Sequence, residues 1–321
     1  MSTPLATIPS APPGGVLAID AGQSSIKVRH LADGMVANWS TAGIRTDRPL
    51  LPQLADVLAE AGQRGSTAEA VGIGASGLTD EGLEARVLMR VAAQLGARSL
   101  SIAHDSITSF LGALGDGRGA VVAAGTGVVT LAVGRTEIAR VDGWGHLLGD
   151  AGSGYWIGRA AFDAVLRAND GRGPATALTD IVRAGFPVLE DAYIELQADP
   201  ERVQRIAGFA RPVAEAAASG DAVAVTISQA AAEELAHSVV CALLRVGEVA
   251  QEPGSAVLQV RGIGGVLGSA VLAGAFEEAV RRRIPTADVR VGTADPLDGA
   301  ALLPAVADLS ALRHRLVRVG V

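Results

Sequence analysis

The sequence predicts an α/β protein with two domains. Its 321 residues are too many for one ordinary hydrophobic core. Apolar residues make up 49% of the chain, which is enough to fill two cores. A pattern of apolar strand, glycine turn and second strand occurs twice, as LAIDAGQSSIKVRH near the start and as VVAAGTGVVTLAVG after residue 119. This weak internal repeat indicates a duplicated unit.

Apolar runs bounded by turn residues place the elements of the first half. Buried strands are expected at 15–22, 70–76 and 99–105, and the alternating segment SSIKVRHLADG followed by MVANWS predicts two more strands beside the first. Helices are expected at 50–62, at 81–97 and from 105 to about 114.

The loop at 115–119 separates the two halves, and the strand pattern then restarts at 120–127, 128–134 and 136–143. The rest is mostly helical, with strands at 256–262 and 288–292 and helices at 154–167, 177–185, 200–219, 221–249, 266–280 and 296–308. These elements predict a disordered arm rich in Pro and Ser at 1–14, a small domain formed by 15–114 plus 298–321, and a large domain at 115–297.

Composition excludes several classes of protein. The net charge is −7 and the chain has no basic block, which argues against a partner that is a nucleic acid. The single cysteine, Cys241, excludes a disulfide framework and an all-cysteine metal site. The longest apolar run, 120–133, is shorter than the ~20 residues that a membrane span needs, and the first residues lack the features of a signal peptide. We therefore expect a cytoplasmic protein without a membrane partner.

Three glycine turns are candidate phosphate sites. They lie at 20–25, 125–128 and 262–268, and the last one opens a predicted helix. Glycine lets backbone N–H groups approach an anion closely, although each turn alone is equally an ordinary tight hairpin. The motif GIGG also fits a loose dinucleotide fingerprint, but no acidic residue follows at the required distance, and the chain has no GxxxxGK[ST] motif.

Two aspartates follow buried strands. Asp20 stands beside the first glycine turn, where a carboxylate can hold Mg²⁺ through water or can cap the turn. Asp105 ends the strand SIAHD and opens a helix, a position that suits either helix capping or proton abstraction. These residues alone leave both alternatives open.

The stretch GWGHLLGDAGSGYWIGR, residues 143–159, contains six glycines, two tryptophans and an aspartate. With this stretch, DAGQSS, AGTG and RGIGG, the sequence resembles the sugar kinases of the actin-like ATPase superfamily over almost its whole length after residue 15. The most similar group contains the N-acetylglucosamine and glucosamine kinases, together with the BadF/BadG/BcrA/BcrD-type ATPases. The resemblance implies two ribonuclease-H-like domains flanking a central cleft, with ATP and Mg²⁺ as cofactors.

The resemblance also implies roles for individual residues. Asp105 matches the catalytic base, and Asp20 matches the acid associated with Mg²⁺. The matches to the ATP-binding loops are Gly22, Gln23, Ser24, Ser25, Gly125, Thr126, Gly127, Gly264 and Gly265. The matches to the sugar-binding residues are Ser76, Thr126, Gly127, Gly143, Trp144 and Asp150. Glycines let backbone groups reach sugar hydroxyls, and a carboxylate such as Asp150 can accept hydrogen bonds from two of them.

Departures from the family pattern bear on the substrate. Residues 45–49 read RTDRP, where related N-acetylglucosamine kinases carry Ser-Thr-Asn-His-Trp, and Ala151 stands where Glu is frequent. Asp47 therefore replaces an amide, and a carboxylate suits a free ammonium group. Asp150 can play the same part, whereas Arg45 and Arg48 can neutralise Asp47.

The sequence thus predicts an ATP-dependent kinase for an amino sugar, most simply glucosamine, phosphorylated at the C6 hydroxyl. Kinases for N-acetylglucosamine or glucose are alternatives, as is a sugar sensor that keeps the fold without catalysis. An ATPase that activates a partner protein through a cluster held by cysteines is disfavoured by the single cysteine. A homodimer stays open.

Overall fold

The computed structural model describes residues 14–22, 25–32, 34–45, 47–78, 85–248 and 257–320. The chain forms two compact units. The N-terminal unit contains the described residues up to 118 together with 133–138 and 294–320, and the C-terminal unit contains 119–132 and 139–293. The chain therefore changes unit near 118 and near 293, where the sequence-based boundaries lie at 114 and 297.

The N-terminal unit is built on a six-stranded sheet with the order β11-β5-β4-β1-β2-β3. The strands are β1 (Val16–Ala21), β2 (Ser25–Ala32), β3 (Met35–Ala42), β4 (Ala70–Ala75), β5 (Ser99–His104) and β11 (Leu316–Gly320). β1 pairs antiparallel with β2 and parallel with β4, which in turn pairs parallel with β5. The helices of this unit are α1 (Leu50–Gln63), α2 (Ala85–Ala92), α3 (Asp105–Leu114) and α11 (Pro296–Leu302).

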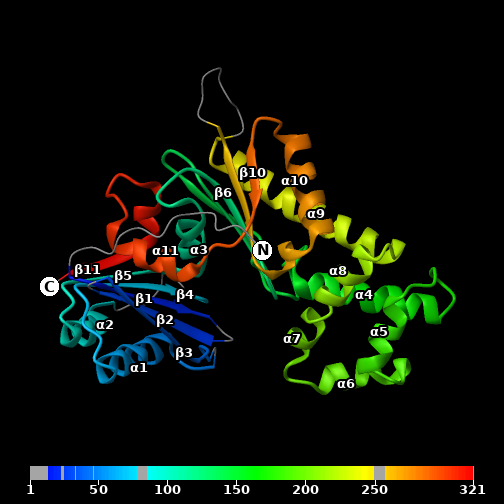
Figure 1. Cartoon of the computed structure of the whole chain (residues 1–321), viewed down its shortest axis with the longest axis horizontal. Coiled ribbons are helices and arrows are strands. Elements are labelled where there is room, and N and C mark those ends of the chain that lie inside the picture. The colour runs from blue at the N-terminus through cyan, green and yellow to red at the C-terminus, as the bar shows by residue number, and fades with distance from the viewer. Residues whose placement is uncertain are drawn as a thin grey trace. The chain divides into compact units, whose positions relative to one another are not determined.

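The C-terminal unit contains a five-stranded sheet with the order β10-β9-β6-β7-β8, of which Figure 1 labels β6 and β10. Its strands are β6 (Gly119–Ala124), β7 (Val128–Val133), β8 (Ile138–Val141), β9 (Gln259–Ile263) and β10 (Asp288–Val291). Its helices are α4 (Gly154–Asn169), α5 (Leu178–Gly185), α6 (Ala192–Ala198), α7 (Arg202–Ala207), α8 (Ala210–Ala218), α9 (Ala222–Arg245) and α10 (Ala270–Arg283).

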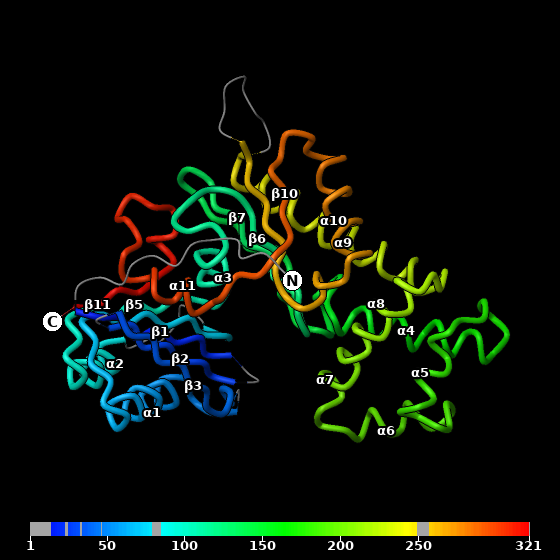
Figure 2. The backbone as a smooth tube through the Cα atoms, viewed as in Figure 1, coloured from blue at the N-terminus to red at the C-terminus, as the bar shows by residue number. Residues whose placement is uncertain are grey.

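The two sheets share one strand order. In each, the next two strands of the chain follow the first strand on one side, and the later strands follow on the other, namely β4, β5 and β11 in the N-terminal sheet and β9 and β10 in the C-terminal sheet. In the tube view, the chain passes from β6 through a tight turn into β7 (Figure 2). The duplicated strand, turn and strand of the sequence are thus the starts of two sheets of the ribonuclease-H-like type.

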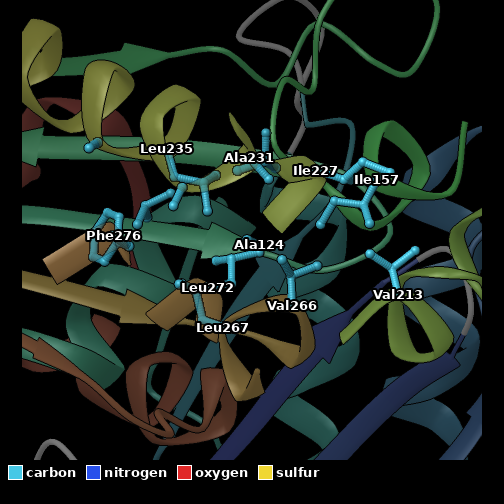
Figure 3. Packing of buried hydrophobic residues seen from close by; sticks show 14 of the residues in the cluster. Ala124, Ile157, Val213, Ile227, Ala231, Leu235, Val266, Leu267, Leu272 and Phe276 are labelled. Carbon is cyan, nitrogen blue, oxygen red and sulfur yellow. The ribbon is translucent and has the colours of Figure 1, made fainter. Parts of the chain in front are cut away.

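Small aliphatic side chains fill the core of the C-terminal unit. Ala231 and Leu235 of α9 face Ala124 at the end of β6 (Figure 3), and Leu272 and Phe276 of α10, which packs against α9, belong to the same buried cluster. All five are buried. Because alanines let α9 approach the sheet closely, the end of β6 is held rigidly where the glycine turn begins.

The structure corrects several expected elements. The helix expected at 200–219 is interrupted at Gly208, so it forms α7 and α8, and the helix expected from 266 begins at Ala270 after a short 3₁₀ turn. α6 and β11 were missed, the latter because LVRVG follows a helix-like segment without a turn signal. The arm at 1–14 falls almost wholly outside the described residues. Within the described part of the chain, no helix is both long and apolar enough to cross a membrane.

Candidate active site

In the N-terminal unit, three predicted residues gather at the carboxyl ends of parallel strands. Asp20 lies in β1 opposite Gly74 of β4, and Asp105 follows β5 directly. Ser76 follows β4, and its backbone N–H donates to the carbonyl of Ala21 (3.0 Å). Parallel strands end at the same edge of a sheet, so these side chains lie close together although they are far apart in the sequence.

Asp105 is held as an ionised carboxylate. Its Oδ1 lies 2.8 Å from Nδ1 of His104, and the Ser76 hydroxyl also hydrogen-bonds its side chain. Burial raises the pKa of the Asp105 carboxyl, but the bonds from His104 and Ser76 outweigh burial and hold this pKa below its usual value. The carboxylate is therefore charged at neutral pH, as a proton acceptor must be.

Asp20 has the opposite character. The pKa of its carboxyl is raised to about 6: burial raises it most, the charge of Lys27 on the neighbouring strand opposes the rise, and the charges of Asp105 and Asp295 add to it. The pKa values of Asp105 and Asp20 are thus shifted in opposite directions. Such a pair is typical of a site in which one carboxylate accepts a proton and the other is kept charged by a bound cation. Among the described residues, no cluster of three or more acidic, His or Cys side chains forms a complete metal site.

Arg29 joins this site to α11, which sequence reasoning did not anticipate. Its guanidinium bonds Asp295 (2.7 Å) and also pairs with Asp298 in the first turn of α11. Asp295 also caps this helix by accepting the N–H of Leu297 (3.0 Å). The motif DPLDG, with its aspartate cap and proline at the first helical position, is the sequence signal that could have revealed the cluster.

In the C-terminal unit, the second glycine turn is tied to the start of α4. The N–H of Gly125 donates to the carbonyl of Gly127 (2.8 Å), so the turn closes on itself. The N–H groups of Gly154 and Tyr155 donate to the carbonyls of Gly125 (2.8 Å) and Thr126 (3.1 Å). The turn that resembles a phosphate loop and the helix that ends the glycine-rich stretch therefore form one structural unit.

The third glycine turn meets the same place. Gly264 follows β9 with φ of 102°, and a Cβ there would lie 2.3 Å from the carbonyl oxygen of Ala124. Only glycine fits this approach. Gly265 begins a 3₁₀ turn, and among the described residues other than its chain neighbours, no atom lies within 4 Å of the position of its missing Cβ. The second and third turns thus meet at the end of β6.

The stretch between β8 and α4 has an unusual backbone. Five residues have positive φ, and two of them, Asp142 (60°) and Asp150 (57°), are not glycine; the glycines are Gly143, Gly145 and Gly152. Left-handed backbone costs a side-chain-bearing residue about 1–2 kcal/mol, so other contacts must hold the two aspartates in place. This chain of turns explains why the sequence is so rich in glycine here.

Asp150 is buried inside this loop, 7% exposed. Its Oδ1 accepts the N–H of Gly145 (3.1 Å), and its Oδ2 would lie only 2.6 Å from a Cβ at Gly127. Burial raises the pKa of the Asp150 carboxyl, the bond from Gly145 lowers it, and the nearby charge of Asp142 raises it. The carboxylate of the sugar-like stretch is therefore packed directly against the second glycine turn.

The remaining predicted residues have various surroundings. Trp144 is 64% exposed, with the guanidinium of Arg140 over its ring (5.5 Å). Asp47 is also exposed, and it forms an ion pair with Arg45 (2.8 Å). The N–H of Gly22 donates to the carbonyl of Ser25 (3.2 Å) and so closes the first turn, whereas Gln23 and Ser24 lie outside the described residues.

Besides Arg29 and its two aspartates, sequence reasoning missed His104 and Asp142. Each stands next to a residue that the resemblance selected, His104 before Asp105 and Asp142 before Gly143. Adjacency was the available signal, but nothing in the sequence says that the His104 ring turns back onto Asp105, or that Asp142 reaches residues 150 and 151.

Two sheets of one strand order, each with a glycine turn after its first strand, define an ATPase of the actin-like, ribonuclease-H-like class. The chain belongs to the BadF/BadG/BcrA/BcrD ATPase family, whose profile matches residues 17–304.

Individual relatives agree with this assignment. An N-acetyl-D-glucosamine kinase from Dictyostelium discoideum is 29% identical over 243 residues, covering 74% of this chain and 75% of the relative. An N-acetylmuramic acid/N-acetylglucosamine kinase from Clostridium acetobutylicum is 30% identical over 198 residues, covering 60% and 64%. Among solved structures, a candidate N-acetylglucosamine kinase from Chromobacterium violaceum has a TM-score of 0.66 at 24% identity and covers 92% of this chain and 99% of its own.

Proposed function

We propose that this protein is a kinase that transfers the γ-phosphoryl group of ATP to a hydroxyl group of an amino sugar, at C6. The observation that carries the proposal is Asp105, a carboxylate kept ionised by His104 and Ser76 at the carboxyl end of a parallel sheet. Membership of an ATPase family and two curated relatives named as kinases of amino sugars support it.

In this proposal Asp105 is the catalytic base. It accepts the proton of the attacking sugar hydroxyl, and its low pKa keeps it unprotonated and ready. Ser76 orients the carboxylate and offers a hydroxyl to the sugar. Because phosphoryl transfer needs little covalent help from the protein, we expect most of the rate to come from the positioning of the two reactants.

The residues of the chain fit ATP and Mg²⁺. The turns at 125–127 and 264–265 present bare backbone at the end of β6, and apart from adjoining residues no atom of the described part of the chain lies within 4 Å of the missing Cβ atoms of Gly125 and Gly265. Asp20, with its raised pKa, is a carboxylate that a cation would stabilise in its charged form. Bound Mg²⁺ would neutralise charge on the phosphate oxygens.

We assign recognition of the amino group to Asp150 and propose glucosamine as the substrate. Asp47 is exposed and already forms an ion pair with Arg45, so it is a weaker candidate than Asp150 for binding the ammonium group. Asp150 and Asp142 place two carboxyl groups in one loop, and within the described part of the chain neither forms an ion pair with Arg or Lys. A buried carboxyl with a raised pKa gains from an ammonium partner, because the cation stabilises its charged form.

N-acetylglucosamine is the second candidate. Both curated relatives carry this sugar in their names, and the loss of Asp47 to an ion pair removes one argument for a free amine. The neutral acetamide of N-acetylglucosamine gains nothing from the charges of Asp142 and Asp150. If the pocket admits both sugars, their binding free energies therefore differ by the electrostatic attraction of the ammonium group.

The deciding experiment compares kcat/KM for glucosamine, N-acetylglucosamine, N-acetylmuramic acid and glucose on one preparation, with ADP release as the readout. Glucosamine should exceed N-acetylglucosamine by about 10–100-fold, the value of one charge-assisted hydrogen bond. A reversed order would transfer the assignment to N-acetylglucosamine. Sugar binding by calorimetry without ADP release would instead indicate a non-catalytic sensor.

A further inference from the structure

Asp142 closes the loop that contains Asp150. Its two carboxylate oxygens accept the backbone N–H groups of Asp150 (2.7 Å) and Ala151 (2.9 Å), eight and nine residues further along the chain. Charge-assisted bonds of this length are among the stronger hydrogen bonds in proteins. The loop is thus clamped at its base by one side chain.

The position of the clamp determines what it controls. Asp150 has φ of 57°, a conformation that its side chain disfavours, and the bond to its own N–H lies at the atom next to that torsion. Ala151 is fixed by the second oxygen, so the peptide that follows Asp150 is fixed as well. Two bonds from one carboxylate therefore set the direction in which the Asp150 side chain leaves the backbone.

The hydrogen bonds that Asp142 accepts restrict which residue can precede Asp150. A Cβ at Gly149 would lie 2.5 Å from Oδ1 of Asp142 and 2.9 Å from Cβ of Trp144, so the residue before Asp150 must be glycine while the clamp is closed. Burial and the charge of Asp142 raise the pKa of the Asp150 carboxyl. The hydrogen bonds from the backbone of Gly145 and Val128 and the charge of His146 lower it. Two carboxyl groups would not be brought so near for stability alone, since like charges repel.

We infer that Asp142 is a positioning residue for sugar recognition, which acts by fixing the backbone of Asp150. The inference rests on the proposed function, in which Asp150 binds the sugar. Asp142 sets the orientation in which the Asp150 carboxylate accepts the N–H of Gly145 and faces the turn at Gly127.

The test compares two carboxylates that each accept two backbone N–H groups. Asp221, also in the C-terminal unit, accepts the N–H groups of Ala177 (2.8 Å) and Ala224 (2.8 Å), but it caps helix α9 and does not contact the loop at 142–152. We expect Asp142→Ala to raise the KM for the sugar about 10–100-fold while the KM for ATP stays within twofold. Asp142→Asn, which keeps one acceptor oxygen, should lie in between, and Asp221→Ala should lower Tm without changing the sugar KM.

A second readout does not depend on catalysis. In protein labelled with ¹⁵N-glycine, the amide resonance of Gly145 reports its bond to Asp150, and a Gly145→Ala variant identifies the peak. Asp142→Ala should move this resonance although Asp142 does not bond Gly145, and Asp221→Ala should leave it in place. An unchanged Gly145 resonance, or a sugar KM within threefold of wild type in Asp142→Ala, overturns the inference. A wild-type protein that phosphorylates no sugar of the panel, with a Gly145 resonance that responds as expected, overturns the proposed function instead.

Discussion

Replacing Gly127 by alanine should impair sugar recognition before anything else. An alanine Cβ would lie 2.6 Å from Oδ2 of Asp150 and 3.3 Å from its Cγ. The first distance is about 0.8 Å short of ordinary van der Waals contact, so either the turn or the carboxylate must move. The turn is held by the bonds from Gly154 and Tyr155 to its carbonyls, and Asp150 is therefore the group that gives way.

The size of the effect follows from the bond that Asp150 makes. Its Oδ1 accepts the N–H of Gly145 at 3.1 Å, and a shift of about 0.8 Å away from that donor exceeds the range of a hydrogen bond. A bond to a charged acceptor contributes about 1.5–3 kcal/mol. We therefore expect kcat/KM for the sugar to fall about 10–150-fold, in line with the general cost of misplacing a binding group by ~1 Å.

Steady-state kinetics with ADP release, at saturating ATP and then at saturating sugar, separates the two substrates. Gly274→Ala is the matched control, because Gly274 lies in α10 and a Cβ there meets no protein atom within 4 Å. If Gly127→Ala retains its sugar kcat/KM within threefold of wild type, or if the whole loss appears in the KM for ATP, the contact between Gly127 and Asp150 does not govern sugar binding. Gly127→Val should abolish ATP binding as well, since a branched side chain would also fill the space proposed for phosphate.

Four further outcomes are expected. Asp105→Asn should lower kcat about 10²–10⁴-fold with little change in sugar affinity, and turnover within threefold of wild type would leave Asp105 as a helix cap. His104→Ala removes a bond that lowers the pKa of Asp105, so the acidic limb of the kcat/KM profile should move to higher pH; an unmoved limb would mean that the ring does not act on the base. Asp150→Asn should reduce the preference for glucosamine over N-acetylglucosamine more than Asp47→Asn does, and the reverse order would return the amine to Asp47. The bonds from Ala224, Ala177 and Thr176 outweigh burial and lower the pKa of Asp221; the stability it contributes is therefore full above its unfolded pKa and is lost as pH falls through the lower folded value, so Asp221→Asn should flatten the fall of Tm between about pH 5 and pH 3.

Much of the fold could be predicted because its signals are local. The strand and glycine-turn pattern at 15–32 and at 120–134 depends on neighbouring residues, and the structure places a sheet start at each. β11 could not be predicted, because its pairing partner β5 lies more than two hundred residues earlier. The interruption between α7 and α8 was missed although two residues that disfavour a helix interior, Gly208 and Pro212, lie within residues 200–219.

The resemblance to a family predicted which residues form the candidate site. It did not predict the contacts that His104 and Asp142 make with residues near them in the chain. Asp20, Ser76 and Asp105 were selected from sequence, and the sheet brings them to one edge. The contact from His104 to Asp105 depends on a ring torsion, and the clamp from Asp142 depends on five positive φ angles between residues 142 and 152. Neither is encoded in spacing, so a resemblance to a family cannot supply them.

The route of the chain through its units has a consequence for biogenesis. Residues 294–320 return to the N-terminal unit, where α11 lies along β1 and β11 pairs with the edge of β5. A ribosome must therefore release the whole C-terminal unit before the N-terminal sheet can be completed, and until then the edge of β5 lacks its neighbour. Exposed strand edges invite association with other chains. Premature termination near residue 294 would thus leave the C-terminal unit able to fold and the N-terminal unit prone to aggregate through the open edge of β5.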